Sequence, residues 1–260
     1  MRVPVVEATA VAAHDAMRGW SRPGEQALVA LAVRVFGRGA VVLDAGVGSG
    51  LTALPLARAG LHVIGLDLAP LMLRALLHRR DVSLPVAIAD VAALPIATGQ
   101  LHGAFVSNVL HHVVPWEQAL RELSRALRPQ GQLLLNLGDG PAEGEAAEVG
   151  EFVAAALAER GAVAPAQADS LSVARVHDVL AGLGHPLHET VVVEDETWHP
   201  LADVVGWHAH NPWQQSDVGT TAARRLAAVA ALAWGRDRYG EGELLRRTRN
   251  VRFYRYGSPG

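Results

Sequence analysis

Short apolar runs alternate with amphipathic segments between residues 41 and 135, and this alternation limits the possible folds more than any other feature of the chain. The runs are rich in Val, Leu and Ala, and we expect strands at 41–43, 62–66, 86–89, 101–108 and 132–135. Helical patterns lie between most of them, at 51–58, 71–78 and 116–127. Strands that alternate with helices indicate βαβ units. We therefore predict an α/β fold built on a doubly wound, mostly parallel sheet.

The pattern changes after residue 137. Residues 138–148 are rich in Gly, Glu and Ala and are expected to form a loop, before helices near 150–159 and 172–182 and a strand near 187–193. A helical stretch at about 201–239 precedes a last strand at 251–256. Three parts are expected: a helical cap at 1–38, a sheet domain formed by 39–199 and 248–260, and a helical lid insertion at 200–247.

The composition excludes several kinds of chemistry. The chain has no cysteine, and all 23 of its basic residues are arginine. Disulfides, Cys-ligated zinc and thiolate nucleophiles are therefore absent, as are Schiff bases and P-loops that need a lysine. The net charge of −3 does not favour a nucleic-acid partner, and the arginines between 246 and 255 are interpreted as a solvated chain end. No run approaches the roughly 20 apolar residues that span a bilayer, so we expect no membrane partner and a cytoplasmic protein.

A glycine-rich turn follows the first strand. Gly46, Gly48 and Gly50 leave room for the backbone to approach a ligand closely. In an open parallel sheet, ligands bind beyond the carboxyl ends of the strands, where the strand order reverses. The helix after the turn directs its free N–H groups to the same place, which favours a carboxylate or a phosphate.

Three successive strands end in an acidic residue: Asp44, Asp67 and Asp90. Asp67 lies about 20 residues after the glycine turn, where an acid can accept hydrogen bonds from ribose hydroxyls. A negative charge at Asp44 opposes a pyrophosphate and suits an ammonium group. The predicted ligand thus has an amine, a carboxylate and a ribose. Residues 48–53 also fit the G-x-G-x-x-[GA] dinucleotide pattern, so an NAD(P)-dependent oxidoreductase is a weaker alternative that leaves Asp44 and Asp90 unexplained.

Five segments resemble the motifs of class I S-adenosylmethionine-dependent methyltransferases, in the ubiquinone/menaquinone-biosynthesis-like, methyltransferase type 11 branch. Residues 41–50 (VVLDAGVGSG) resemble the first motif, [DE]-x-G-x-G-x-G, and residues 65–73 resemble the second-strand motif. Residues 89–95 (ADVAALP), 107–113 (SNVLHHV) and 123–133 resemble the later motifs in the same order. Gln130 stands where the family often has Gly, and this departure affects a turn.

The resemblance implies a Rossmann-like sheet of seven strands, with S-adenosylmethionine as the cofactor and S-adenosylhomocysteine as the product. Its implied cofactor-binding residues are Asp44, Gly46, Val47, Gly48, Gly50, Asp67, Leu68, Asp90, Val91, Asn108 and Val109. A binding protein that keeps this pocket without transferring a methyl group is an alternative that the motifs leave open.

We predict a small-molecule acceptor, methylated on oxygen, nitrogen or carbon by in-line transfer. The sequence leaves the acceptor's identity and the oligomeric state open. No [DN]-P-P-[YFW] motif of amino-methylating DNA enzymes follows the fourth strand. His111 and His112 are candidate catalytic bases or a structural pair, and no metal is expected. Residues 198–213 are rich in Trp and His, up to Trp213, and suggest a lid. Substrate-pocket candidates are His14, Trp20, Trp116, Trp207 and His208.

Overall fold

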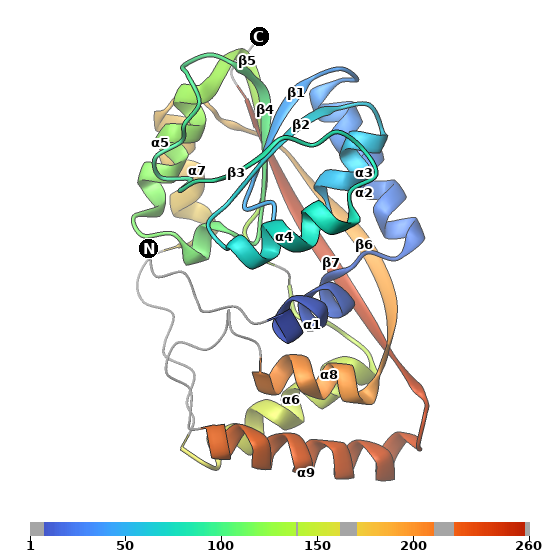
Figure 1. Ribbon diagram of the computed structural model, residues 1–260. Coiled ribbons are helices and arrows are strands. Elements are labelled where there is room, and N and C mark those ends of the chain that lie inside the picture. The colour runs from blue at the N-terminus through green and yellow to red at the C-terminus, as the bar shows by residue number, and fades with distance from the viewer. Residues whose placement is uncertain (1–7, 139, 162–170, 211–220, 258–260) are drawn as a thin grey trace.

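A seven-stranded sheet forms the centre of the computed structural model, which describes residues 8–138, 140–161, 171–210 and 221–257 (Figure 1). The strands run in the order β3-β2-β1-β4-β5-β7-β6. Their bounds are β1 Val41–Ala45, β2 His62–Asp67, β3 Val86–Ile88, β4 Leu101–Ser107, β5 Leu127–Asn136, β6 Leu187–Pro200 and β7 Leu244–Gly257. β1 to β5 pair in parallel, and β7 is antiparallel to both of its neighbours. The predicted fold class is confirmed.

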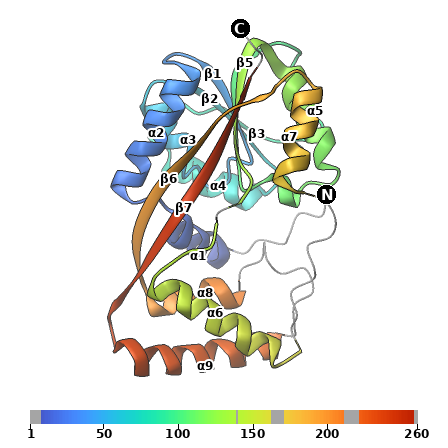
Figure 2. The ribbon, with the colours of Figure 1, turned by 180° about the vertical axis from the view of Figure 1, so that it is seen from behind.

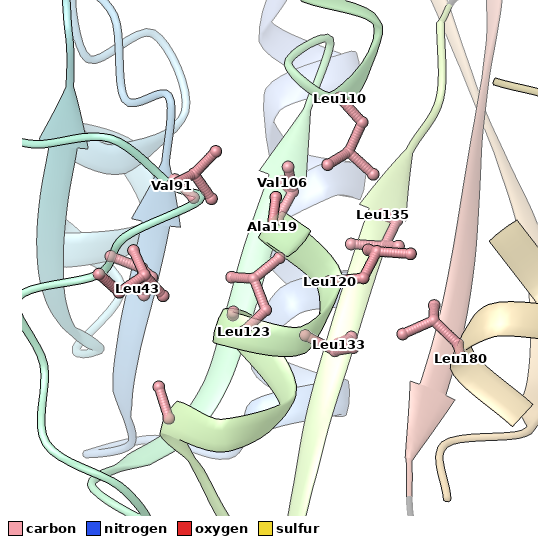
Figure 3. Close-up of a cluster of buried hydrophobic side chains, with 14 of the residues drawn as sticks. Leu43, Val91, Val106, Leu110, Ala119, Leu120, Leu123, Leu133, Leu135 and Leu180 are labelled. Atoms are coloured by element: carbon pink, nitrogen blue, oxygen red, sulfur yellow. The ribbon is translucent and has the colours of Figure 1, made fainter. Parts of the chain in front are cut away.

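Helices cover both faces of the sheet (Figures 1 and 2). One face carries α2 (Arg22–Phe36), α3 (Ala53–Arg58) and α4 (Pro70–Arg79), and the other carries α5 (Trp116–Ala126) and α7 (Val173–Gly182). Leu120 and Leu123 of α5 are fully buried against the sheet residues Leu43, Val106 and Leu133, as Figure 3 shows. Because both faces are covered, the strands are continuous apolar runs, which is why the sequence pattern identified them.

The strand order reverses between β1 and β4. β1 pairs with β2 on one side and with β4 on the other, and the chain crosses from β3 to β4 between them. Such a reversal opens a crevice at the carboxyl ends of the two strands, where α/β proteins bind ligands. The glycine turn follows β1 at this point, and the short 3₁₀ helix η1 (Leu110–His112) follows β4.

Four helices lie beyond the carboxyl edge of the parallel strands: α1 (Ala8–Arg18), α6 (Glu145–Ala158), α8 (Leu201–His210) and α9 (Thr221–Tyr239) (Figure 1). Val149 and Val153 of α6 share a buried cluster with Val204 and Val205 of α8. The prediction of a loop through residue 148 was wrong, since α6 begins at Glu145. α6 packs with the insertion helices, although its sequence was assigned to the sheet domain.

β6 and β7 form an antiparallel pair that is longer than the sequence pattern predicted. The pairing continues from Val193↔Val251 to Pro200↔Leu244, so β7 begins inside the stretch assigned to the insertion. In the chain, α8 and α9 lie between β6 and β7, and in space they lie beyond the end of this antiparallel pair (Figure 2). The turn at Gln130, which the sequence motif implied, lies within β5, where Gln130 has a φ of 65°. No helix in the described ranges has the length and apolar character needed to cross a bilayer, and Trp213 lies outside those ranges.

Candidate functional site

The glycine turn after β1 has little room for side chains. Gly46, Gly48 and Gly50 have φ values of 80°, 55° and 84°, which L-residues with a Cβ rarely adopt. A Cβ on Gly46 would also collide with the side chain of Val109, which follows β4. The Gly46 amide donates to the Leu66 carbonyl at 2.7 Å, so the turn is tied to β2. Val47 is buried, and its side chain packs against Gly65 in the core.

Asp44 is a buried acid at the end of β1. Its exposed fraction is 3 %, and no group in the described part of the chain donates a hydrogen bond to its carboxyl group. Burial raises the pKa of Asp44 to about 8, and the neighbouring Asp67 carboxylate adds to the increase. A buried acid without a donor or a counter-charge is costly in its charged form. A cation placed beside Asp44 would remove that cost.

Asp67 ends β2 and holds the turn from the other side. Its Oδ2 accepts from the Gly48 amide at 2.8 Å, and its Oδ1 accepts from the Ala69 amide at 2.8 Å. Burial raises its pKa, and hydrogen bonds from the backbone amides, including that of Leu68, oppose the increase. Since each carboxylate oxygen can accept more than one hydrogen bond, both remain able to accept from a ligand hydroxyl.

The third acid, Asp90, follows β3 at the edge of the sheet. Its Oδ1 accepts from the Ala92 amide at 2.9 Å, so the side chain also closes a local turn. Val91 is buried in the core between the sheet and α5. The three acids thus lie at or just beyond the carboxyl ends of three neighbouring strands, as predicted. Asp67 and Asp90 also accept hydrogen bonds from backbone amides, and Asp44 has the Asp67 carboxylate as a neighbour.

The segment after β4 contains the two candidate bases. Asn108 has a φ of 57°, which is uncommon outside glycine, and its amide donates to the Asn136 carbonyl at 3.2 Å. The rings of His111 and His112 lie with their centroids 3.9 Å apart. His111 is exposed and His112 is half-buried. Burial lowers the pKa of His112, so its imidazole is neutral at pH 7 and able to accept a proton.

Helix α1 lies across the carboxyl edge of the sheet, between α4 and α8 (Figures 1 and 2). His14 stands 6.0 Å from Trp207 of α8, measured between ring centroids, in an edge-to-face arrangement. His14 also lies near enough to Asp67 to lower the pKa of that carboxyl group, although less than burial raises it. Two of the predicted pocket residues, His14 and Trp207, therefore lie together, and His14 is close to Asp67.

The other pocket candidates have packing roles. Trp20 stacks on Phe253 at 6.5 Å and beneath the Arg249 guanidinium at 4.5 Å, in the core on the α2 side of the sheet. Trp116 is 5 % exposed at the start of α5, with Arg175 over its ring. The His208 ring presses on Gly150 of α6, and burial lowers its pKa to about 4. Trp20, Trp116 and His208 therefore have packing contacts with β7, α7 and α6, respectively.

Sequence reasoning missed Asp15, which lies on α1 and accepts hydrogen bonds from Ser49 of the glycine turn and from Arg79 of α4. Nothing in the one-dimensional pattern brings residues 15, 49 and 79 together. Asn136 was also missed: it is 1 % exposed at the end of β5, and its Nδ2 donates to the carbonyls of Gly138 and Arg252. The sequence feature that could have identified Asn136 is a polar residue at the end of an apolar strand.

Comparisons with known proteins agree with this geometry. A family described as a methyltransferase domain matches residues 43–135. The ubiquinone biosynthesis O-methyltransferase of Xanthomonas oryzae pv. oryzae is 36 % identical over 130 residues, which are 47 % of this chain and 54 % of that protein. The chain thus spans about half the length of the curated relative that it matches.

Two solved structures share the fold. An Anaeromyxobacter dehalogenans protein described as a type II methyltransferase superposes with a TM-score of 0.65 at 20 % identity, covering 92 % of this chain and 97 % of that one. Phosphoethanolamine N-methyltransferase 2 of Haemonchus contortus, solved with S-adenosyl-L-methionine, gives 0.55 at 19 % identity, covering 98 % and 58 %.

The fold and the reversal of strand order between β1 and β4 define an α/β protein of the Rossmann-like class. Residues 43–135 match a methyltransferase domain, and the resemblance to class I S-adenosylmethionine-dependent methyltransferases stated from the sequence is confirmed.

Proposed function

We propose that the chain binds S-adenosylmethionine at the carboxyl ends of β1, β2 and β4 and transfers its methyl group to a small molecule. Asp44 is the observation that carries this proposal. A buried carboxyl group with no donor among the described residues, beside a second carboxylate, fits a ligand that brings its own positive charge. The ammonium group of S-adenosylmethionine supplies one.

The other candidate residues at the carboxyl ends of the strands fit the rest of the cofactor. The turn of Gly46, Val47, Gly48 and Gly50 would face the methionine end, since its backbone can approach a ligand closely. Asp67 and Leu68 would hold the ribose, Asp90 and Val91 the adenine, and Asn108 and Val109 would lie against the cofactor at the end of β4. When bound, the cofactor supplies an activated methyl group, so the chain's own task is orientation, exclusion of water and removal of an acceptor proton.

We infer that the acceptor is a phenolic ring with a free hydroxyl, of the kind found in quinone precursors. The similarity to a ubiquinone biosynthesis O-methyltransferase supports this class. A half-buried, neutral His112 after β4 suits the removal of a phenol proton during transfer. His14 and Trp207 would line the acceptor side of the site, because α1 and α8 meet there.

A turnover assay tests the proposed function. The chain is incubated with S-adenosylmethionine and a panel of catechols and polyhydroxybenzoates, and S-adenosylhomocysteine is measured. We expect turnover with at least one catechol and none for Asp44→Ala. For His112→Gln we expect kcat to fall by about 10²–10⁴-fold with cofactor binding unchanged. Binding without turnover on any phenol would contradict methyl transfer to this class and favour the binding-protein alternative.

A further inference from the structure

Asp15 joins three elements around the glycine turn. Its carboxylate accepts from the Ser49 hydroxyl and the Arg79 guanidinium, and the His14 Nδ1 lies 3.1 Å from its Oδ1. Only 16 % of the Asp15 side chain is exposed. Burial raises the pKa of Asp15, but the hydrogen bonds from His14 and Ser49 and the charge of Arg79 together lower it by more. The pKa therefore lies below its ordinary value, and the group is ionised at neutral pH.

Ser49 is the residue on which the inference depends, because it lies inside the turn. It is 1 % exposed and stands between two glycines that have positive φ. The Gly48 amide donates to Asp67 at 2.8 Å, while the adjacent Ser49 hydroxyl donates to Asp15. Carboxylates from two separate elements therefore fix consecutive residues of the turn. The contacts with Asp67 and Asp15 therefore fix the orientation of the backbone amides in this part of the turn.

Other contacts hold α1 in place. Val11 packs against Ala69 and Met72, in a cluster that does not involve Asp15. At the other end of the helix, the Arg247 guanidinium donates to the Met17 carbonyl at 3.0 Å, and Arg249 donates to the Gly19 carbonyl at 2.9 Å. Because both ends have their own attachments, the Asp15 contacts are not needed to keep the helix on the sheet.

We propose that Asp15 is a positioning residue that acts through Ser49 to orient the glycine turn around the methionine end of the cofactor. This inference rests on the proposed function. It assigns to α1 a part in binding the cofactor, separate from any contact with the acceptor.

Calorimetric titration with S-adenosylhomocysteine tests it on the full chain. We expect Asp15→Ala and Ser49→Ala each to raise the Kd about tenfold, the effect of losing one hydrogen bond to a charged group. The double variant should bind no more weakly than Asp15→Ala, because both changes remove the same contact. Asp15→Asn, which keeps an acceptor for Ser49, should recover part of the affinity. In turnover, the KM for the cofactor should rise while kcat at saturation stays unchanged.

Asp81→Asn is the matched control, since Asp81 pairs with Arg58 on the exposed surface and should leave the Kd unchanged. If Asp15→Ala is too unstable to measure, Ser49→Ala removes the contact from the other side. Equal Kd values for the wild type and both single variants, or additive losses in the double variant, would overturn the inference. Failure of the wild-type chain to bind would instead overturn the proposed function, so the two failures are distinguishable.

Discussion

Asp44 is a buried carboxyl group whose ionisation depends on what lies beside it. With a folded pKa of about 8, it carries a proton at pH 7 that the unfolded chain releases near the ordinary pKa of 3.8. Its contribution to stability is therefore fully present below about pH 4 and is lost as the pH rises toward 8. An ammonium group bound against it reverses this preference, because the charged form then has a partner.

The first prediction concerns proton release. Binding of S-adenosylhomocysteine at pH 7 should expel close to one proton from Asp44, and the affinity should rise as the pH increases from 6 to 8. Calorimetry in buffers of different ionisation enthalpy measures the proton count. Asp44→Asn should release none and should bind about 2–5 kcal/mol more weakly, since the cation then lacks a counter-charge. Proton release by the Asn variant equal to that of the wild type would assign the effect to another group.

Single residues also mark the limit of sequence reasoning. Asp44, Asp67 and Asp90 were predictable because each follows an apolar strand, and parallel strands end at one edge. Asp15 was not predictable, because its meeting with Ser49 and Arg79 depends on how α1 crosses the sheet. Trp20 and Trp116 are of the residue type that lines ligand pockets, so the sequence suggested a pocket role. Only the structure revealed their contacts with Phe253 and Arg175.

At the scale of elements, the antiparallel pair of β6 and β7 connects the sheet to the helices beyond it. Its buried positions include the ion pair of Arg249 and Asp195, whose side chains are 2 % and 0 % exposed. Asp195 also accepts from the Ser21 hydroxyl at 2.6 Å, at the start of α2. These buried charges interrupt the apolar alternation by which strands are recognised. The sequence therefore predicted only the first half of β6 and the second half of β7.

The second prediction tests that ion pair. Asp195→Ala leaves the Arg249 charge buried without its carboxylate, so we expect the free energy of unfolding to fall by about 3–5 kcal/mol. Glu189→Ala is the matched change on the same strand, because the Glu189–Arg34 pair is partly exposed to solvent and should contribute no more than about 1 kcal/mol. Urea denaturation measures both. Equal losses for the two variants would show that burial does not set the contribution of the pair.

At the scale of the whole molecule, the site lies between a sheet domain and a group of helices. The sheet domain was predictable over residues 41–135, because strands buried on both faces give strong apolar runs. The group of helices was less predictable. α6 was mistaken in part for a loop, since Gly138, Gly140 and Gly144 precede a short Glu- and Ala-rich start. Its contacts with α8 and α9 come from segments distant in the chain, which periodicity does not reveal.

The third prediction concerns acid stability of the helical group. His208 lies between α8 and α6, and burial, aided by the Arg247 charge, lowers its pKa to about 4. Its depressed pKa means that the unfolded chain takes up a proton first as the pH falls below 6.5, so stability should decrease between pH 6.5 and 4. His208→Gln should weaken this decrease, and His78→Gln, at an exposed position, should not. Thermal unfolding at several pH values checks this, and identical profiles for all three chains would contradict it.

Calorimetric titration of the chain with S-adenosylmethionine, S-adenosylhomocysteine and NAD tests the proposed cofactor site most directly. A site built around the buried Asp44 should bind the first two at one site per chain and should not bind NAD, whose pyrophosphate offers no ammonium group to that carboxyl group. Measurable binding of NAD, or no binding of either adenosyl compound, would contradict the account.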